Sequence, residues 1–165
     1  MSDLPAVAQP GRRRIALAAL ASLVLVTAWL GYRNYEVRHI EHKHREMVQA
    51  ARDGALSLTT IDHEHVDENV QRILDASTGS FRDDFEQRAK PFADAARNAQ
   101  SKSVGAVTGA GVESATNNEG QVLVAMTVMT SNRGVPETQP KAWRMRVTVT
   151  ETDGGYKVSR VEFVP

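Results

Sequence analysis

The apolar residues of this chain follow three patterns in succession. An uncharged apolar run covers residues 15–30. Apolar positions then recur every three or four residues from 35 to about 100, which is typical of amphipathic helices. After Lys102 they alternate with polar positions, which is typical of half-buried strands. Helices followed by about four antiparallel strands predict an α+β domain, with the helices packed on one face of a curved sheet.

The uncharged run predicts a transmembrane anchor. At about 1.5 Å per residue it reaches roughly 24 Å, close to the thickness of a bilayer core. Arg12, Arg13 and Arg14 precede it, and positive residues stay on the cytoplasmic side. We therefore expect a cytoplasmic tail (1–14), a single-pass helix (15–35) and an extracytoplasmic, periplasmic remainder. The residues expected to face lipid are Ile15, Leu20, Leu23, Leu25, Trp29 and Leu30.

A cleaved signal peptide is the alternative interpretation of the same run. Cleavage requires a shorter apolar region followed directly by small residues. Here the bulky Trp29 and Leu30 stand where small residues are needed. The pattern favours a retained anchor over a cleaved signal.

The helical region is predicted to contain three helices. Residues 36–60 form a membrane-proximal amphipathic helix, and residues 61–165 form the extracytoplasmic domain. Thr60 or Asp62 is the candidate N-cap of the second helix, and Gly79 its end. The third helix starts near Ser80, and Pro91 predicts a kink or break close to Lys90.

The strand region alternates cleanly in its middle part. Val122, Val124, Met126 and Val128 share one side of a strand, and Trp143, Met145, Val147 and Val149 share one face of the next. Residues 103–116 read as an earlier strand, and residues 153–155 as a hairpin turn before the last one.

Composition narrows the possible functions. The chain has 20 basic and 20 acidic residues and no cysteine. A formal net charge of zero gives no support to nucleic-acid binding, which needs an excess of Lys and Arg on one face. Thiol catalysis, disulfides and thiolate metal sites are excluded.

Five histidines are candidate metal ligands, at positions 39, 42, 44, 63 and 65. A zinc site needs three or four convergent ligands and a second shell. The favoured interpretation is a solvated helical face plus a polar helix start. An opportunistic metal site and a pH-sensing role are the alternatives. No metal is predicted.

No catalytic or cofactor site is predicted either, and the chain is not expected to be an enzyme. The general acid/base candidates lack a partner at a recognisable spacing: Asp62, Asp67, Asp75 and Tyr156. Asp83 and Asp84 are adjacent, so on a helix they point in different directions. Gly105, Gly109 and Gly111 form no nucleotide fingerprint.

Arg144 and Arg146 share one strand face. They are interpreted as the solvent side of the sheet, with pairing to a partner's acidic groups as the alternative. Trp143 is interpreted as core or edge packing, with a ligand platform as the alternative.

Four stretches between about residue 47 and the end form a recognisable pattern: LTTIDHEHVDENVQRILDASTGSFRDDFEQRAKPF, QSKSVGAVTGAGVES, VLVAMTV and KAWRMRVTVTETDGGYKVSRVEFVP. With these stretches the region resembles the Mce-associated membrane proteins of mycobacteria and related actinobacteria. The residues of the family pattern are Asp62, Asp67, Phe81, Phe85, Phe92, Trp143 and Phe163.

The resemblance implies a bitopic protein with a cone-shaped domain of the nuclear transport factor 2 class, similar in plan to inner-membrane scaffold subunits of type IV secretion. It implies a non-enzymatic accessory subunit of an Mce-type complex that imports lipids, a sterol or fatty acid, through the mycobacterial envelope. The expected partners are the bilayer and the subunits of that complex, with homo- or hetero-oligomers possible.

Two alternatives remain open. One is a small-ligand-binding or enzymatic cone, which predicts a roomy cavity lined by Phe81, Phe85, Phe92 and strand residues, with an inward titratable group. The other is an assembly scaffold of a secretion-type membrane complex.

Overall fold

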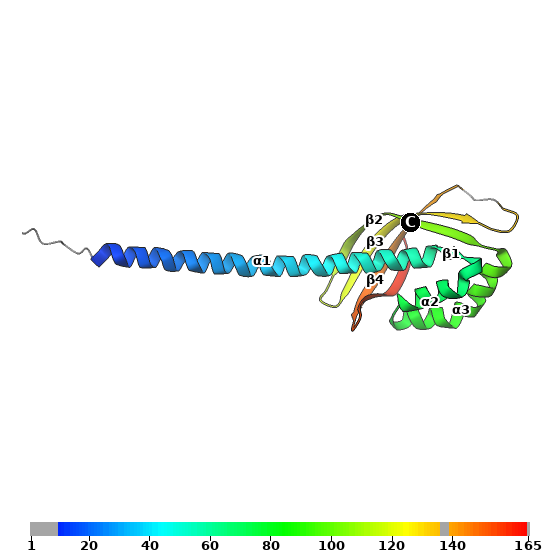
Figure 1. The fold of residues 1–165 in the computed structure, drawn as a ribbon, viewed down its shortest axis with the longest axis horizontal. Helices are drawn as coiled ribbons and strands as arrows, with labels where there is room; N and C mark the ends of the chain where they lie inside the picture. Colours follow the sequence, from blue (N-terminus) through cyan, green and yellow to red (C-terminus); the bar gives the residue numbers. More distant parts are fainter. Residues whose placement is uncertain (1–9, 136–138, 165) are drawn as a thin grey trace, which may run out of the picture. The chain divides into compact units, whose positions relative to one another are not determined.

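The computed structural model describes the backbone of residues 10–135 and 139–164, and only some of the side chains before Ile40. Its contacts divide the chain into two compact units, Met1–His42 and Lys43–Pro165. The elements, labelled in Figure 1, are α1 (Pro10–Thr59), β1 (Ile61–Asp62), the 3-10 helix η1 (His63–His65), α2 (Val66–Asp75), α3 (Gly79–Ala99), β2 (Lys102–Ala115), β3 (Glu119–Ser131), β4 (Lys141–Thr152) and β5 (Gly155–Phe163).

The first unit contains the predicted anchor. Leu20, Leu23, Leu25 and Trp29 are exposed by 60%, 61%, 70% and 57%. The side chains of Ile15, Leu30 and Arg12 to Arg14, and all of residues 1–9, lie outside the described residues. Across the part of the chain that the structure describes, no helix holds an apolar stretch long enough to qualify as a membrane span.

The second unit begins at Lys43, well before the boundary expected at residue 61. The reason is the packing of α1, whose residues Met47, Ala51 and Ala55 are at most 1% exposed. They share one apolar cluster with residues of β3, β4 and β5. The segment expected only as a membrane-proximal helix therefore supplies part of the domain core.

The second helical stretch is shorter than predicted. Asp62, one of the two candidate N-caps, does cap a helix, but the helix is η1 and not α2. Its Oδ1 accepts a hydrogen bond from the Glu64 backbone N–H. Ile61 and Asp62 pair with β2 as a short strand before the helix begins. Helix α2 ends at Asp75, so the prediction that Gly79 ends it was wrong.

Gly79 instead starts α3, with φ at +57°. Glycine reaches this left-handed conformation without a steric penalty, which suits an abrupt change of chain direction. The N-cap is Thr78, one position before Gly79, and not Ser80. The helix runs through Pro91 without a break in its assigned range.

The sheet confirms the predicted α+β class and the antiparallel meander. Its order is β1-β2-β3-β4-β5, with every neighbouring pair antiparallel. The predicted inward row is buried, from Val122 to Val128 on β3 and from Met145 to Val149 on β4. The 153–154 turn joins β4 to β5 as expected, with Gly155 at φ +102°.

Two apolar clusters hold the domain together. The larger one joins α1 to the buried face of the sheet. The smaller one joins β1, α2 and α3 through Ile61, Val66, Ile73, Ala93 and Ala96. Helices α2 and α3 thus form a second packing unit beside α1, next to one end of the sheet (Figure 1).

Candidate functional site

A cavity of about 340 Å³ lies where the end of α1, β1 and α3 meet strands β3 and β4. Its walls are mostly apolar, because α3 contributes alanines and Phe92 while the strands contribute Val128 and Trp143. The full lining is Leu58, Thr59, Ile61, Phe92, Ala95, Ala96, Ala99, Ser101, Ser103, Val128, Thr130 and Trp143.

The three predicted phenylalanines divide among different roles. Phe92 lines the cavity. Phe85 contacts Phe92 with ring centroids 5.8 Å apart, and both pack against the smaller cluster. Phe81 packs against the larger cluster instead. The start of α3 therefore packs against the larger cluster, and its later turns pack against the smaller one.

The residues that line this cavity contain hydroxyl groups but no ionisable side chain. Two hydroxyls are used internally: Thr59 donates to the Ala55 carbonyl at 2.7 Å, and Ser103 donates to the Thr59 carbonyl at 2.8 Å. General acid/base chemistry needs a positioned titratable group. The cavity offers apolar surface and a few polar atoms, which suits binding better than proton transfer.

The other acid/base candidates stand elsewhere in the described part of the chain. Asp67 is exposed and pairs with Arg97 of α3 at 2.5 Å. Asp75 accepts a hydrogen bond from Gln71 one turn earlier, at 2.8 Å. Asp83 and Asp84 are exposed on α3. These positions are typical of structural ion pairs and solvated helix faces.

Tyr156 is half-buried beside the larger cluster. Burial raises the pKa of its phenol, and the nearby Glu151 carboxylate adds to the increase, while Lys43 opposes it. Lys43 itself bridges Glu151 at 3.3 Å and the Asn117 carbonyl at 3.0 Å. The phenol therefore stays protonated at neutral pH and is not a ready general base.

Arg146 pairs with acidic groups of its own chain. Its Nε lies 2.5 Å from a carboxylate oxygen of Glu113 on β2, and Nη1 lies 3.7 Å from Glu162 on β5. The hydrogen bond to Arg146 lowers the pKa of Glu113, and the same bond raises that of Arg146. The guanidinium on β4 thus forms ion pairs with residues of β2 and β5, and these pairs compete with any acidic group of a partner protein.

Phe163 is 67% exposed at the end of β5. Its ring stands edge-on against Trp143, with centroids 5.4 Å apart. Strict alternation from Tyr156 and Val158 would put Phe163 on the opposite face, but the β4–β5 register shifts between Thr148 and Val149 and pairs Phe163 with Met145. The ring is therefore on the side of Met145, at the end of the edge strand β5. The sequence named Phe163 as a residue of the family pattern, but it did not reveal that the ring is exposed beside Trp143, because a bulge cannot be read from periodicity.

The histidine side chains that the structure describes belong to two parts of the chain. His42 is exposed, His44 half-buried, and the side chain of His39 lies outside the described residues. His63 and His65 belong to η1, next to Asp62. The histidines of α1 (His42 and His44) and those of η1 (His63 and His65) are thus two separate groups.

Residues 12–165 match the family described as "Uncharacterized protein Rv1363c/MT1408-like", and the chain belongs to this family. The protein Rv1363c of Mycobacterium tuberculosis (strain ATCC 25618 / H37Rv) is 38% identical over 159 residues. The match covers 93% of this chain and 61% of that relative, so the chain spans about three-fifths of the relative's length.

The fold is similar to that of several solved structures. The periplasmic domain of DotI matches with a TM-score of 0.59 and 15% identity, over 72% of this chain and 92% of that one. An IcmL-like type IV secretion system protein from Legionella pneumophila matches with 0.58 and 11%, over 73% and 91%. A structure provisionally assigned as an aromatic ring hydroxylase, from Novosphingobium aromaticivorans, matches with 0.53 and 15%, over 73% and 90%.

At these identities the likeness concerns the fold alone. The same α+β arrangement occurs in secretion-system domains and in a provisionally assigned enzyme. Function must therefore be argued from this chain's own surfaces and cavity.

Proposed function

We propose that this protein is a non-catalytic scaffold subunit of a membrane complex of the cell envelope. Residues 15–35 anchor it as a single-pass helix, with the N-terminus cytoplasmic and residues 43–165 periplasmic. The fold likeness to the periplasmic domain of DotI and to an IcmL-like secretion protein carries the proposal. The exposed leucines of α1 support it, because exposed apolar side chains on a helix are suited to a lipid environment.

The surface of the domain also suits assembly. The exposed Phe163 with its neighbour Trp143 is an aromatic patch, and aromatic residues are enriched at energetically important positions of interfaces. The cavity lining lacks a titratable group, which weakens the enzymatic alternative. Arg146 is already paired with Glu113 of the same chain. The feature offered to a partner is therefore the aromatic pair Trp143–Phe163 rather than the Arg146 charge.

Two partner classes follow from these arguments. The resemblance described from the sequence favours an Mce-type complex that imports a sterol or fatty acid. The fold comparisons favour a secretion-type assembly, since the similar domains include a type IV secretion system protein. We rank the assembly scaffold first and keep lipid import as the more specific alternative.

The test is crosslinking in native membranes with the full chain. A photo-crosslinking residue replaces Phe163, and a matched variant carries it at Asp84 on the exposed face of α3. Extraction under gentle conditions and mass spectrometry then identify the attached proteins. We expect membrane-complex subunits attached at position 163 and far fewer at position 84.

The identity of the attached subunits separates the two partner classes. Mce-type transport subunits support lipid import, and secretion-channel subunits support the scaffold. Recovery of the chain alone, under conditions that keep another membrane complex of the same cells intact, contradicts the proposed function.

The apolar cavity supports a second candidate, binding of a small apolar ligand. Titration with dodecanoate would change the fluorescence of Trp143, which lines the cavity. Ala95→Leu with Ala99→Leu should abolish the saturable change by filling the mouth. Asn98→Leu, an exposed position of the same helix outside the lining, is the control. A response equal in all three proteins argues against the cavity as a binding site.

A further inference from the structure

Four residues with metal-ligating side chains follow one another at the junction between β1 and α2: Asp62, His63, Glu64 and His65. The backbone there is held from several directions. Asp62 pairs with Lys102 of β2, His63 N–H donates to the Ser101 carbonyl at 3.0 Å, and Asn69 donates to the Asp62 carbonyl at 3.0 Å. The junction is therefore a fixed platform.

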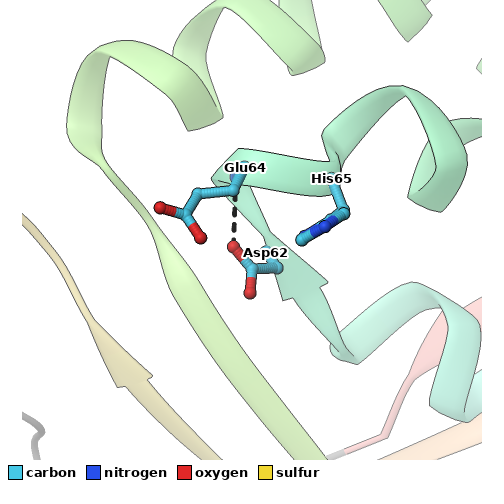
Figure 2. Close-up of side chains that lie close together, drawn as sticks. All are labelled: Asp62, Glu64 and His65. Atoms are coloured by element: carbon cyan, nitrogen blue, oxygen red, sulfur yellow. Dashed lines mark hydrogen bonds between the residues drawn. The ribbon is translucent and has the colours of Figure 1, made fainter.

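Three of these side chains gather on one side of the platform. Figure 2 shows the Asp62 carboxylate between the imidazole of His65 and the carboxylate of Glu64. One ligand atom from each lies within 4.8 Å of the other two. Ligands at about 2.0–2.2 Å from a single ion stand roughly 3–4 Å apart. Small rotations of Glu64 and His65, both exposed, close that gap.

His63 supplies a separate observation at the same place. Its Nδ1 lies 3.7 Å from the Asp62 carboxylate. That nitrogen is buried and has no hydrogen-bond partner within the described residues. A buried ring nitrogen without a hydrogen bond is costly unless something compensates it. The Asp62 carboxylate thus has a second imidazole beside it, although the ligand atoms of His63 lie outside the group formed by Asp62, Glu64 and His65.

The charges around Asp62 are compatible with a bound cation, but the Lys102 ammonium competes with a metal ion for the carboxylate. The Glu64 N–H, followed by Lys102, lowers the pKa of Asp62, so its carboxylate is ionised at neutral pH. The Lys102 ammonium lies 3.4 Å from Asp62 Oδ2, yet its side chain is 59% exposed. It can therefore withdraw into solvent when an ion takes its place.

We propose that Asp62, Glu64 and His65 form a surface site for a divalent transition-metal ion of the Zn²⁺ type. Imidazole with carboxylates is a donor set that suits zinc, whereas calcium and magnesium prefer oxygen alone. The bound ion would pin the start of α2 to the β1–β2 pair. The proposal takes up the metal-site alternative that the sequence left open, and it does not depend on the proposed scaffold function.

The test uses the full chain in detergent, without a histidine tag and freed of metal by a chelator, titrated with Zn²⁺ alone in a calorimeter. We expect one saturable site with a dissociation constant in the micromolar range. His65→Ala should weaken binding by about tenfold or more. Lys102→Met should tighten it, because the competing ammonium is removed.

His42→Ala with His44→Ala is the matched control for the histidines of α1. This variant should bind like the wild type. Circular dichroism confirms that each variant is folded. The proposal is overturned if no saturable binding occurs below about 1 mM, if His65→Ala leaves the affinity unchanged, or if the affinity is lost in the α1 control instead.

Discussion

Single residues set how closely the elements of the domain approach one another. Gly105 on β2 lies directly under α1: an added Cβ would overlap the Thr59 hydroxyl and come 2.8 Å from Met126 Cε. That hydroxyl is itself fixed by a hydrogen bond to the Ala55 carbonyl. The glycine is thus required for close packing and not for backbone freedom.

We therefore expect Gly105→Ala to lower the free energy of unfolding by about 1–3 kcal/mol, the usual cost of overpacking. Gly109→Ala on the same strand is the control, since nothing lies within 4 Å of its added Cβ. Its effect should stay within about 0.5 kcal/mol of zero. Urea unfolding measures both. Equal losses in the two variants would show that strand flexibility, rather than contact with α1, controls this position.

The Glu113–Arg146 pair makes stability depend on pH. The pKa of Glu113 is lowered in the folded state, so its contribution is present above the unfolded pKa of about 4.3 and is lost as the pH falls through the folded value. Between about pH 5 and pH 3 the wild type should lose stability more steeply than Glu113→Gln. Thermal unfolding over this range measures the difference. Asp84→Asn, at an exposed position, should keep the wild-type slope.

At the scale of elements, the C-terminal part of α1 acts as core. Met47 is 1% exposed and packs over Gly120, where a Cβ would meet its sulfur at 2.5 Å. The periodicity from residue 35 predicted this helix and its apolar stripe. It did not reveal which element the stripe covers, because a helical pattern records only that one face is buried.

Met47→Ala should therefore cost about 2–5 kcal/mol of unfolding free energy, as for other large core truncations. Arg45→Ala, two positions away on the exposed face, should change it by less than about 0.5 kcal/mol. Chemical unfolding of the two variants measures the contrast. Similar small effects would mean that α1 is a stalk outside the folding unit.

Other element-level signals were ambiguous in the sequence. Pro91 predicted a kink or a break, and of these two the break does not occur, because α3 continues through Pro91. Gly79 was predicted to end the second helix, but it is the first residue of α3. Proline and glycine indicate that the chain changes its local geometry, but neighbouring contacts decide in which way.

At the scale of the whole molecule, the two units have opposite surface chemistry. Before Lys43 the described apolar side chains of α1 are exposed, whereas after it apolar residues form two buried clusters, although some, such as Phe163 and Leu123, remain exposed. The lipid environment proposed for the first unit would resolve this difference. It is also the physical basis of the proposed anchor.

Leu23→Lys with Leu25→Lys should weaken membrane attachment, because each lysine at a helix centre costs roughly 2.5–3.5 kcal/mol of insertion. Fractionation of cells, followed by carbonate washing, should move this variant from the membrane pellet to the wash. Lys43→Gln with Arg45→Gln is the control and should stay with the membranes. Wild-type protein released by carbonate would contradict the anchor itself.

The sequence by itself determined the order of the long helices and strands, the buried rows of β3 and β4, and the candidate anchor, but not the short strand β1. Periodicity and hydropathy are local properties that long elements display. The tertiary structure alone decided that α1 completes the core, that Phe163 is exposed, that Phe92 but not Phe81 lines a cavity, and that Asp62, Glu64 and His65 meet. Each of these depends on register shifts, on close approach at glycine, or on contacts between residues far apart in the chain. Such contacts leave no periodic mark in a single sequence.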